Sequence, residues 1–379
     1  MKTMLIGIGA AGNKAVVDAI RKGTVKVEDT IIVNSTSKDF PKEYEGTKII
    51  LSDHDTGCGK ERKIAKDLAK DAMSKGKFNI NEKIAEYLTV IIVTSVEGGT
   101  GSGAAPIIAK MFNQVFTKNV HIIALTGFED DVRGLANTVE FFKEIDPAII
   151  VQTISNKSFL NEANGNKLKA EILANYEMAS RISVLTGQDF INGSQNIDDT
   201  DILKLSNTPG YMTVAKKTFN KSLETTYDFE KIIKNMVYNS SSIKSENPAA
   251  VRLGVILNIS PESEDAVDYD FTSLKAAYGN PFEFFKQIQW DGKGEYIAFI
   301  ASGMKMPIDE IEAVYNRYKE ESSKLNKNAD EFFAKMNEFD LLKEDSNYDM
   351  IRKTKDVNTV SVSDFIKNNW YINNMIIDI

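Results

Sequence analysis

The stretch of sequence that decides the fold reads Glu97-Gly98-Gly99-Thr100-Gly101-Ser102-Gly103-Ala104-Ala105-Pro106. It follows Leu88–Val96, an Ile/Val-rich run that predicts a strand buried on both faces of a sheet. Four glycines with interleaved hydroxyl side chains can form a nest of backbone N–H groups that suits anionic oxygens. Proline is tolerated where a helix starts, so we predict a helix over Pro106–Phe116. An ordinary glycine-rich turn is the alternative, but the flanking strand and helix favour a phosphate site.

A second glycine-rich loop lies near the N-terminus and reads Gly7-Ile8-Gly9-Ala10-Ala11-Gly12-Asn13. Glycine lets the backbone approach a phosphate closely, and the helix that the loop opens would supply free N–H groups. This GxGxxG pattern taken alone is equally compatible with a Rossmann dehydrogenase. A dinucleotide fold, however, needs an acid at the end of the second strand to hold a ribose. The sequence there reads Val33-Asn34-Ser35-Thr36, which argues against that alternative.

Short apolar runs alternate with helical patterns through the first half of the chain. The runs predict strands at Thr3–Ile8, Thr30–Asn34, Lys48–Leu51, Leu88–Val96, Val120–Thr126 and Ala148–Ile154. Helical patterns cover Lys60–Ser74 and, as a longer helix, about Asn166–Leu185. This alternation predicts an α/β fold with a mostly parallel sheet.

The second half of the chain has a different pattern. A polar, turn-rich segment at Gly187–Thr200 precedes predicted helices around Tyr211–Asn239 and predicted strands at Val251–Ile259 and Gly294–Ala301. After Pro307, apolar residues keep helical spacing from Ile308 to Phe339 and predict a long helix. A polar tail follows from about Asp345.

The amino-acid composition excludes several classes of function. Hydrophobic residues make up 42% of the chain, enough for a globular core. The net charge of −8 argues against direct binding of nucleic acid, which needs a clustered basic surface. One cysteine and two histidines cannot form an internal disulfide or a Cys/His zinc site, and Cys58 is interpreted as a small loop residue. Without a signal peptide or a membrane-spanning run, we expect a cytoplasmic protein.

The loop Gly98–Gly103 matches the signature GGGTG[ST]G of the tubulin/FtsZ family, with Glu97 in place of the first glycine. The chain has no GxxxxGK[ST] loop, which excludes the Walker-type solutions. The resemblance covers roughly Met1–Pro307 and implies a GTPase that uses GTP/GDP and Mg²⁺. It implies a Rossmann-like parallel-sheet GTP-binding domain over 1–165, a long central helix over 166–190, a smaller α+β second domain with the catalytic loop over 191–306, and a C-terminal helix and tail over 307–379. No side chain is predicted as a metal ligand in its own right.

The resemblance also implies which residues bind the nucleotide. The phosphate loops would contribute Gly9, Ala10, Ala11, Gly12, Gly98, Gly99, Thr100, Gly101, Ser102 and Gly103, and the loop Asp55–Lys60, which resembles the family's γ-phosphate loop, would contribute Gly57 and Gly59. Gly127–Arg133 resembles the family's ribose loop, with Gly127 in place of a proline and with Glu129 and Arg133 as the sugar contacts. A solvated charged turn is the alternative for that loop. Three asparagines match the guanine-selecting positions, namely Asn13, Asn156 and Asn175.

Catalysis in this family is completed by a neighbouring subunit through the pattern NxDxx[DE]. Asn196-Ile197-Asp198-Asp199-Thr200-Asp201 fits that pattern, so Asn196, Asp198 and Asp201 are the predicted catalytic residues. Carboxylates three residues apart at a helix start lie on one face and could orient a water beside a γ-phosphate. The alternative is that both aspartates are helix caps. A site split between subunits requires a heterologous contact, and such a contact propagates as a head-to-tail filament.

The long helix and modest tail after Pro307 resemble the TubZ branch of the family more than division-type FtsZ. That likeness implies segregation of plasmid or phage DNA through a DNA-bound adaptor protein, with no membrane partner. The alternative is a filament of the same fold with another cargo, such as a division ring or a phage-positioning spindle. Arg352 and Lys353 with the aromatic residues Phe365, Trp370 and Tyr371 suit either a docking motif for the adaptor or a tail packed along the parent molecule.

Overall fold

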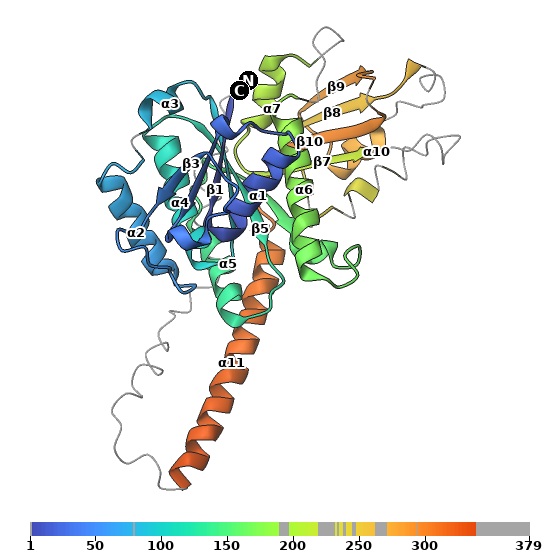
Figure 1. Ribbon diagram of the computed structural model, residues 1–379. Coiled ribbons are helices and arrows are strands. Elements are labelled where there is room, and N and C mark those ends of the chain that lie inside the picture. The colour runs from blue at the N-terminus through green and yellow to red at the C-terminus, as the bar shows by residue number, and fades with distance from the viewer. Residues whose placement is uncertain are drawn as a thin grey trace, which may run out of the picture. The chain divides into compact units, whose positions relative to one another are not determined.

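The computed structural model describes residues 2–78, 80–188, 197–218, 232, 235–237, 240–244, 248–261, 271–292 and 294–338. The chain divides into two compact units, Met1–Pro307 and Ile308–Ile379, and each is described by itself. In the second unit the described element is one long helix, α11 (Ile308–Glu338) (Figure 1). This confirms the helix predicted after Pro307 as far as Glu338, and the residues of the tail lie outside the described part of the chain.

A single sheet organises the first unit, and its ten described strands run in the order β3-β2-β1-β4-β5-β6-β7-β10-β8-β9. The N-terminal strands are all parallel to one another. They are β1 (Thr3–Ile8), β2 (Thr30–Asn34), β3 (Thr47–Ile50), β4 (Thr89–Ser95), β5 (Asn119–Thr126) and β6 (Ile150–Ser155). Each coincides with a predicted strand to within two residues. The predicted α/β class with a mostly parallel sheet is therefore confirmed for this half.

The remaining strands are β7 (Tyr211–Thr218), β8 (Arg252–Asn258), β9 (Glu283–Gln289) and β10 (Tyr296–Met304). β10 pairs antiparallel with both β7 and β8, whereas β8 and β9 are parallel. A short parallel pairing of Val151 with Tyr211 joins β6 to β7, so the sheet continues into the second half of the chain. The proposed domain boundaries at 165, 190 and 306 stay a prediction.

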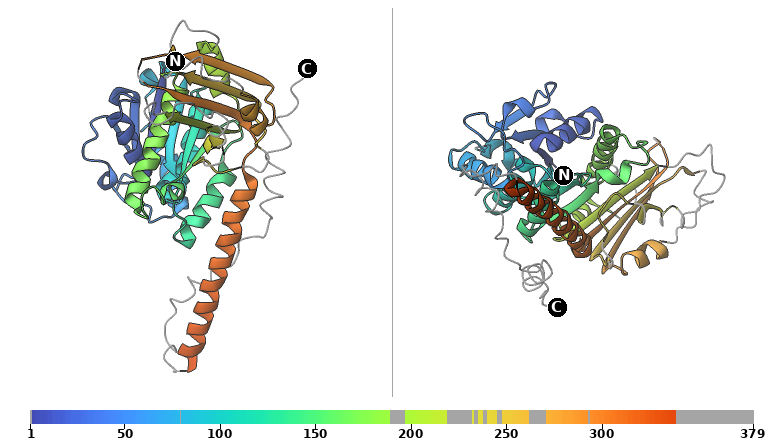
Figure 2. Two further views of the ribbon diagram at one scale, coloured as in Figure 1. Left: turned by 90° about the vertical axis from the view of Figure 1, so that its right-hand side faces the viewer. Right: turned by 90° about the horizontal axis from the view of Figure 1, so that it is seen from below.

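Helices cover both faces of the parallel half of the sheet, as the two views of Figure 2 show. On one face α1 (Gly9–Arg21) packs against α6 (Lys167–Leu185), and on the other α4 (Gly99–Gln114) packs between α2 (Arg62–Ser74) and α5 (Val132–Glu144). Shorter helices are α3 (Asn81–Ala85), α7 (Asp199–Ser206) and α10 (Thr272–Ala277), with 3₁₀ turns η1 (Val27–Asp29), η2 (Ser37–Asp39) and η3 (Asn156–Phe159).

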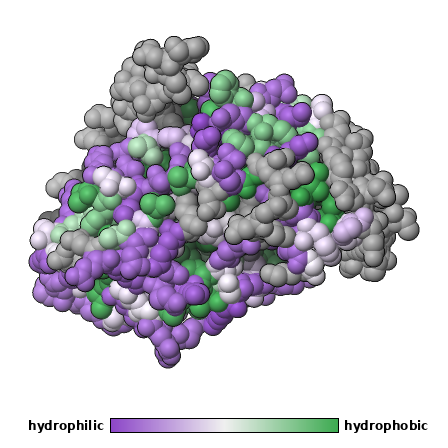
Figure 3. Space-filling view, turned by 90° about the horizontal axis from the view of Figure 1, so that it is seen from above, coloured by the Kyte–Doolittle hydropathy of each residue, from purple (hydrophilic) through white to green (hydrophobic). Residues whose placement is uncertain are grey.

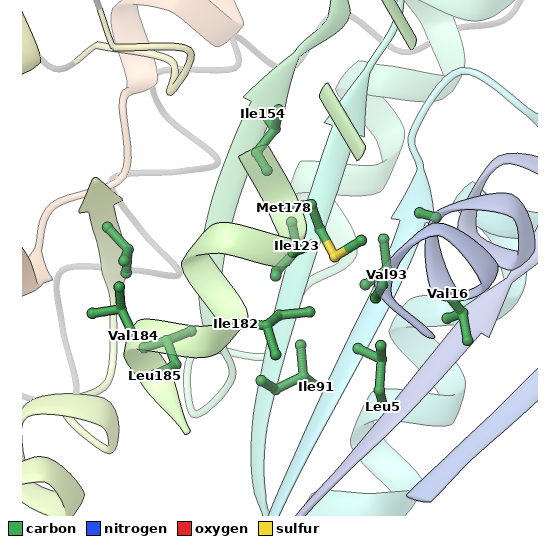
Figure 4. Packing of buried hydrophobic residues seen from close by; sticks show 14 of the residues in the cluster. Leu5, Val16, Ile91, Val93, Ile123, Ile154, Met178, Ile182, Val184 and Leu185 are labelled. Carbon is green, nitrogen blue, oxygen red and sulfur yellow. The ribbon is translucent and has the colours of Figure 1, made fainter. Parts of the chain in front are cut away.

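The core beneath α1 and α6 explains why these helices lie where they do. Val16 of α1 and Met178 and Ile182 of α6 lie over β-strand residues that include Leu5, Ile91, Val93 and Ile123 (Figure 4). All are buried, so removal of their apolar area from water holds both helices on the sheet. On the surface shown in Figure 3, hydrophobic residues are scattered among hydrophilic ones. None of the helices in the described part of the chain combines the length and apolar character needed to cross a bilayer.

The predicted helices around Tyr211–Asn239 are wrong at their start, because Tyr211–Thr218 is the strand β7. Its Met212 and Val214 pack in the core, and pairing with β10 fixes the extended conformation. Tertiary contacts thus override local preference. Residues 219–231 lie outside the described residues. The helices α3 and α5 lie between strands of the first half, where helical patterns are predicted without bounds, whereas β9 and α10 have no counterpart among the predictions.

The helix predicted over Pro106–Phe116 is wrong at its N-terminus, because α4 begins at Gly99 and Pro106 lies inside it. A proline inside a helix leaves the carbonyl four residues earlier without its N–H donor. Here Nη2 of the buried Arg62 donates to that carbonyl, the Ser102 O, over 3.0 Å. The freed acceptor is therefore satisfied, and the helix continues through the proline.

Candidate functional site

A pocket of about 330 Å³ opens where β1, β2 and β4 end. Ile8, Asn34 and Ser95, the last residues of these strands, lie in its wall. The carboxyl edge of a parallel sheet is the usual place for a ligand in α/β folds. The predicted nucleotide-binding residues that line the pocket are Gly9, Ala10, Ala11, Gly57, Gly59, Gly98, Gly99, Thr100 and Gly101.

Two helices begin at this pocket. The first residues of α1, Gly9 to Ala11, and of α4, Gly99 to Gly101, all line it. Neither N-cap residue, Ile8 or Gly98, makes a side-chain cap hydrogen bond, and neither first turn contains an acid. The first N–H groups of a helix have no intrahelical acceptor and carry about half a positive charge between them. Two such starts facing one space form a site for an anion with several oxygens, such as a polyphosphate.

At three positions around the pocket, glycine allows one backbone segment to approach another closely. Gly9 has φ +77°, and a Cβ there would lie 3.0 Å from the Gly101 N. A Cβ on Gly99 would lie 2.7 Å from the Lys60 Cα, and one on Gly101 would lie 2.8 Å from the Ser95 O. Contacts this short with backbone atoms cannot be relieved by a rotamer change. The close approach of the loops therefore requires the absence of side chains.

Three predicted loop residues, Gly12, Ser102 and Gly103, do not line the pocket. A Cβ on Gly12 would overlap the carbonyl of Val93, and a Cβ on Gly103 would lie 2.6 Å from the Arg62 O. The buried Ser102 donates its hydroxyl to the Gly98 O. In this structure these residues shape the turn and its packing.

The loop Asp55–Lys60 forms another wall of the pocket. Asp55, Gly59 and Lys60 all have positive φ values, at 53°, 53° and 63°. Ser37 donates its backbone N–H and its hydroxyl to the carboxylate of Asp55, which holds the loop beside the end of β2 and lowers the pKa of Asp55. Cys58 is buried and lines the pocket, in agreement with its interpretation as a small loop residue.

Sequence reasoning missed several residues of the site. Asn34, Ser35 and Asp39 line the pocket, and the Ser35 hydroxyl lies 2.9 Å from the Thr100 hydroxyl. Asn137 of α5 is buried, and its Nδ2 donates to the Lys60 O over 3.1 Å and to the Glu97 O over 3.0 Å. Asn34 ends a predicted strand and Ser35 follows it, at the edge of the sheet that holds the glycine loops, and this position could have identified both residues. Nothing in the sequence around Asn137 indicated its role.

The predicted sugar contacts Glu129 and Arg133 do not line the pocket. The Glu129 carboxylate lies 3.3 Å from the Lys157 Nζ, and Arg133 pairs with Glu61. Lys60, which does line the pocket, reaches back to Asp131 over 2.7 Å and lowers the pKa of that carboxyl. Ion pairs therefore join the 127–133 loop to the 58–61 loop beside the pocket. A direct role of Glu129 or Arg133 at a sugar stays a prediction.

The three predicted guanine partners also lie outside the lining. Asn13 is fully buried in α1, where its Nδ2 donates to the Val33 O over 3.3 Å. Asn175 of α6 donates to Oδ2 of Asp18 over 2.8 Å, and Asn156 is the first residue of η3. Their selection of a base stays a prediction.

Asp198 and Asp201 form a capping box at the start of α7. Oδ1 of Asp198 accepts the Asp201 N–H over 2.9 Å, and Oδ2 of Asp201 accepts the Asp198 N–H over 3.4 Å. This geometry is the cap alternative that the sequence left open. Neither residue lines the pocket of its own chain. Asn196 lies outside the described residues. Among the described residues, no cluster of three or more His, Cys, Asp or Glu side chains is placed to hold a metal ion.

Comparison with known proteins agrees with this geometry. Residues 2–164 match the family model described as "Tubulin/FtsZ family, GTPase domain". This part of the chain therefore resembles the GTPase domain of the Tubulin/FtsZ family.

Tubulin-like protein CetZ3 of Haloferax volcanii is 28% identical over 233 residues, which are 55% of this chain and 58% of CetZ3. The chain spans less than two thirds of the length of the curated relatives that it matches. The structure of TubZ from Clostridium botulinum phage c-st superposes with a TM-score of 0.67 at 16% identity and covers 86% of this chain and 99% of that one. CetZ2 from Haloferax volcanii, a GTPγS-bound protofilament, superposes with a TM-score of 0.69 at 17% identity, covering 86% and 100%. The chain thus has the Tubulin/FtsZ fold.

Alanine substitutions at two adjacent glycines test how closely the loops pack around the pocket. Gly99→Ala should lower the free energy of unfolding by about 1–3 kcal/mol, because its Cβ meets the backbone of Lys60. Gly98→Ala is the matched control, since nothing lies within 4 Å of its Cβ and its φ is −77°. It should change that free energy by less than about 1 kcal/mol. Urea denaturation of both variants measures the difference, and equal losses would contradict the assigned close approach.

Proposed function

We propose that the protein binds GTP with Mg²⁺ in this pocket, hydrolyses it to GDP and phosphate, and assembles head to tail into filaments. The main observation in support is that α1 and α4 both begin at this pocket without a side-chain cap. The N–H groups of Gly9–Ala11 and Gly99–Gly101 would bind the phosphate oxygens. Bound Mg²⁺ would neutralise charge on the phosphates and polarise the bond to be broken.

The placement of the acidic residues supports a site completed by a second subunit. Hydrolysis needs a group that orients a water in line with the γ-phosphate. The only carboxylate among the described lining residues is Asp39, from η2. We assign the water-orienting role to Asp198 and Asp201, with Asn196, from the next subunit. Helix capping and this role are compatible, because each cap hydrogen bond occupies one oxygen of its carboxylate.

Assembly is supported by the solved relatives, one of which is a GTPγS-bound protofilament of CetZ2. For the cargo, the likeness to TubZ and the net charge of −8 favour segregation of plasmid or phage DNA in the cytoplasm through a basic, DNA-bound adaptor. A filament with another cargo remains the second candidate, because CetZ proteins superpose equally well. The presence or absence of a gene for a small DNA-binding protein beside this one separates the two.

The linkage of turnover to assembly tests the proposed function. With GTP and Mg²⁺, light scattering should rise above a critical protein concentration, and GTP turnover should appear only there. ATP at the same concentration should give neither signal. Specific activity that is constant well below the critical concentration would show that one subunit holds a complete active site.

Asparagine substitutions separate the catalytic role of the aspartates from the cap. An amide oxygen still accepts the cap hydrogen bond, so Asp198→Asn and Asp201→Asn should keep α7 folded while removing a charge. Each should slow GTP turnover by about 10²-fold or more and leave polymerisation intact, giving persistent filaments. Asp199→Asn, which removes a neighbouring acid, is the matched control. Normal turnover in both variants would leave the aspartates with the cap role alone.

A further inference from the structure

Two of the departures from the family's loop patterns, Glu97 and Gly127, lie against each other. A Cβ built on Gly127 would be 2.7 Å from Oε1 of Glu97 and closer still to Oε2 and Cδ. The carboxylate of Glu97 therefore fills the space that a side chain at position 127 would take. Position 97 carries a glutamate where the family has a glycine, and position 127, thirty residues further along the chain, carries a glycine where the family has a proline.

The Glu97 carboxylate also forms a hydrogen bond with the loop that contains Gly127. Its Oε1 accepts the backbone N–H of Glu129 over 3.0 Å. Glu129 has φ +58°, a conformation that non-glycine residues adopt only where the surroundings stabilise it. Gly134, in the first turn of α5, allows the close approach, since a Cβ there would lie 3.3 Å from the Glu97 Cβ.

The loop held in this way connects the two walls of the pocket. Glu97 directly precedes Gly98, which starts one wall. At the other end of the held loop, Asp131 binds the Lys60 Nζ over 2.7 Å, and Lys60 belongs to the opposite wall. Asn137 completes the connection, because its Nδ2 donates to the carbonyls of both Lys60 and Glu97.

Burial and the neighbouring acids disfavour the charged form of the Glu97 carboxylate. Burial raises its pKa, and Asp131, Glu129 and Asp130 raise it further, whereas the Glu129 N–H lowers it. The nearby cations are paired with other acids, since Lys60 binds Asp131 and Arg133 binds Glu61. Groups whose pKa values are perturbed by burial and by neighbouring charges cluster at functional sites.

We propose that Glu97 is a positioning residue for the nucleotide. Its carboxylate, seated in the space left by Gly127, holds residues 127–131 and, through Asp131 and Lys60, sets the distance between the two phosphate-binding walls. The inference rests on the proposed nucleotide site. Glu97 touches no phosphate in this account and acts through the loop.

The contact itself is tested without nucleotide, by a double-mutant cycle of Glu97→Gly and Gly127→Ala. Gly127→Ala should lower the melting temperature of the otherwise unchanged protein by roughly 3 °C or more, because the new Cβ displaces the carboxylate. In the Glu97→Gly background the same change should cost less than a third of that shift. Gly57→Ala, whose Cβ meets nothing within 4 Å, is the control. Equal costs in both backgrounds would overturn the contact.

The positioning role is tested by GTP affinity, measured by calorimetry on the same proteins. Glu97→Gly should weaken GTP binding about tenfold, although it restores the glycine of the family pattern, and should change kcat at saturating GTP by less than about twofold. Glu97→Gln should bind within about twofold of the unchanged protein, because its amide oxygen can accept the same N–H. Gly127→Ala should weaken binding as much as Glu97→Gly, and the double variant no further.

Each outcome has a distinct meaning. Unchanged GTP affinity in Glu97→Gly, or a loss in Glu97→Gln equal to that in Glu97→Gly, would overturn the positioning role. A failure of the unchanged protein to bind GTP would refute the proposed function, and the melting cycle would still decide whether Glu97 and Gly127 are coupled.

Discussion

The structure depends on one constraint, which is that two helices must begin at the same pocket. Free N–H groups at a helix start need acceptors, and burying them without partners is costly. In α1 and α4 no side chain caps these groups, and the first residues of both helices line one pocket. Helix starts suit anionic oxygens, and a polyphosphate has enough oxygens to accept hydrogen bonds from both starts.

This constraint determines much of the surrounding sequence. Gly9, Gly99 and Gly101 allow the loops to approach within backbone contact distance, and helix α4 begins in the glycine loop itself. The early start of α4 leaves Pro106 inside the helix, and Arg62 supplies the donor that the proline lacks. The parallel strands β1 and β4 lie side by side, so their ends deliver both loops to the same edge of the sheet. On the other side of the pocket, Asn137 fastens the 58–61 loop to the glycine loop.

Much of this could be predicted from the sequence, and the failures have physical causes. The parallel strands and the glycine loops have local signals, because a buried strand is an apolar run and a close backbone approach requires glycine. The strand β7 was missed because pairing with β10 and core packing of Met212 decide its conformation. Asn137 and the Glu97–Gly127 contact join segments that are distant in sequence, and no local pattern encodes such a contact. The hydrogen bonds of Asp198 and Asp201 match the cap alternative, and one chain alone cannot display a role toward a neighbouring subunit.

Hydrogen exchange at the two helix starts tests the central claim most directly. The first three N–H groups of α1 and α4 lack intrahelical acceptors, so they should exchange rapidly in the protein without nucleotide. Addition of GDP should slow exchange in the peptides that contain Gly9–Ala11 and Gly99–Gly101 together, with one apparent affinity, and should leave peptides from α11 unchanged. Protection of only one helix start, or of neither, would contradict the account that a single anionic ligand is held by both.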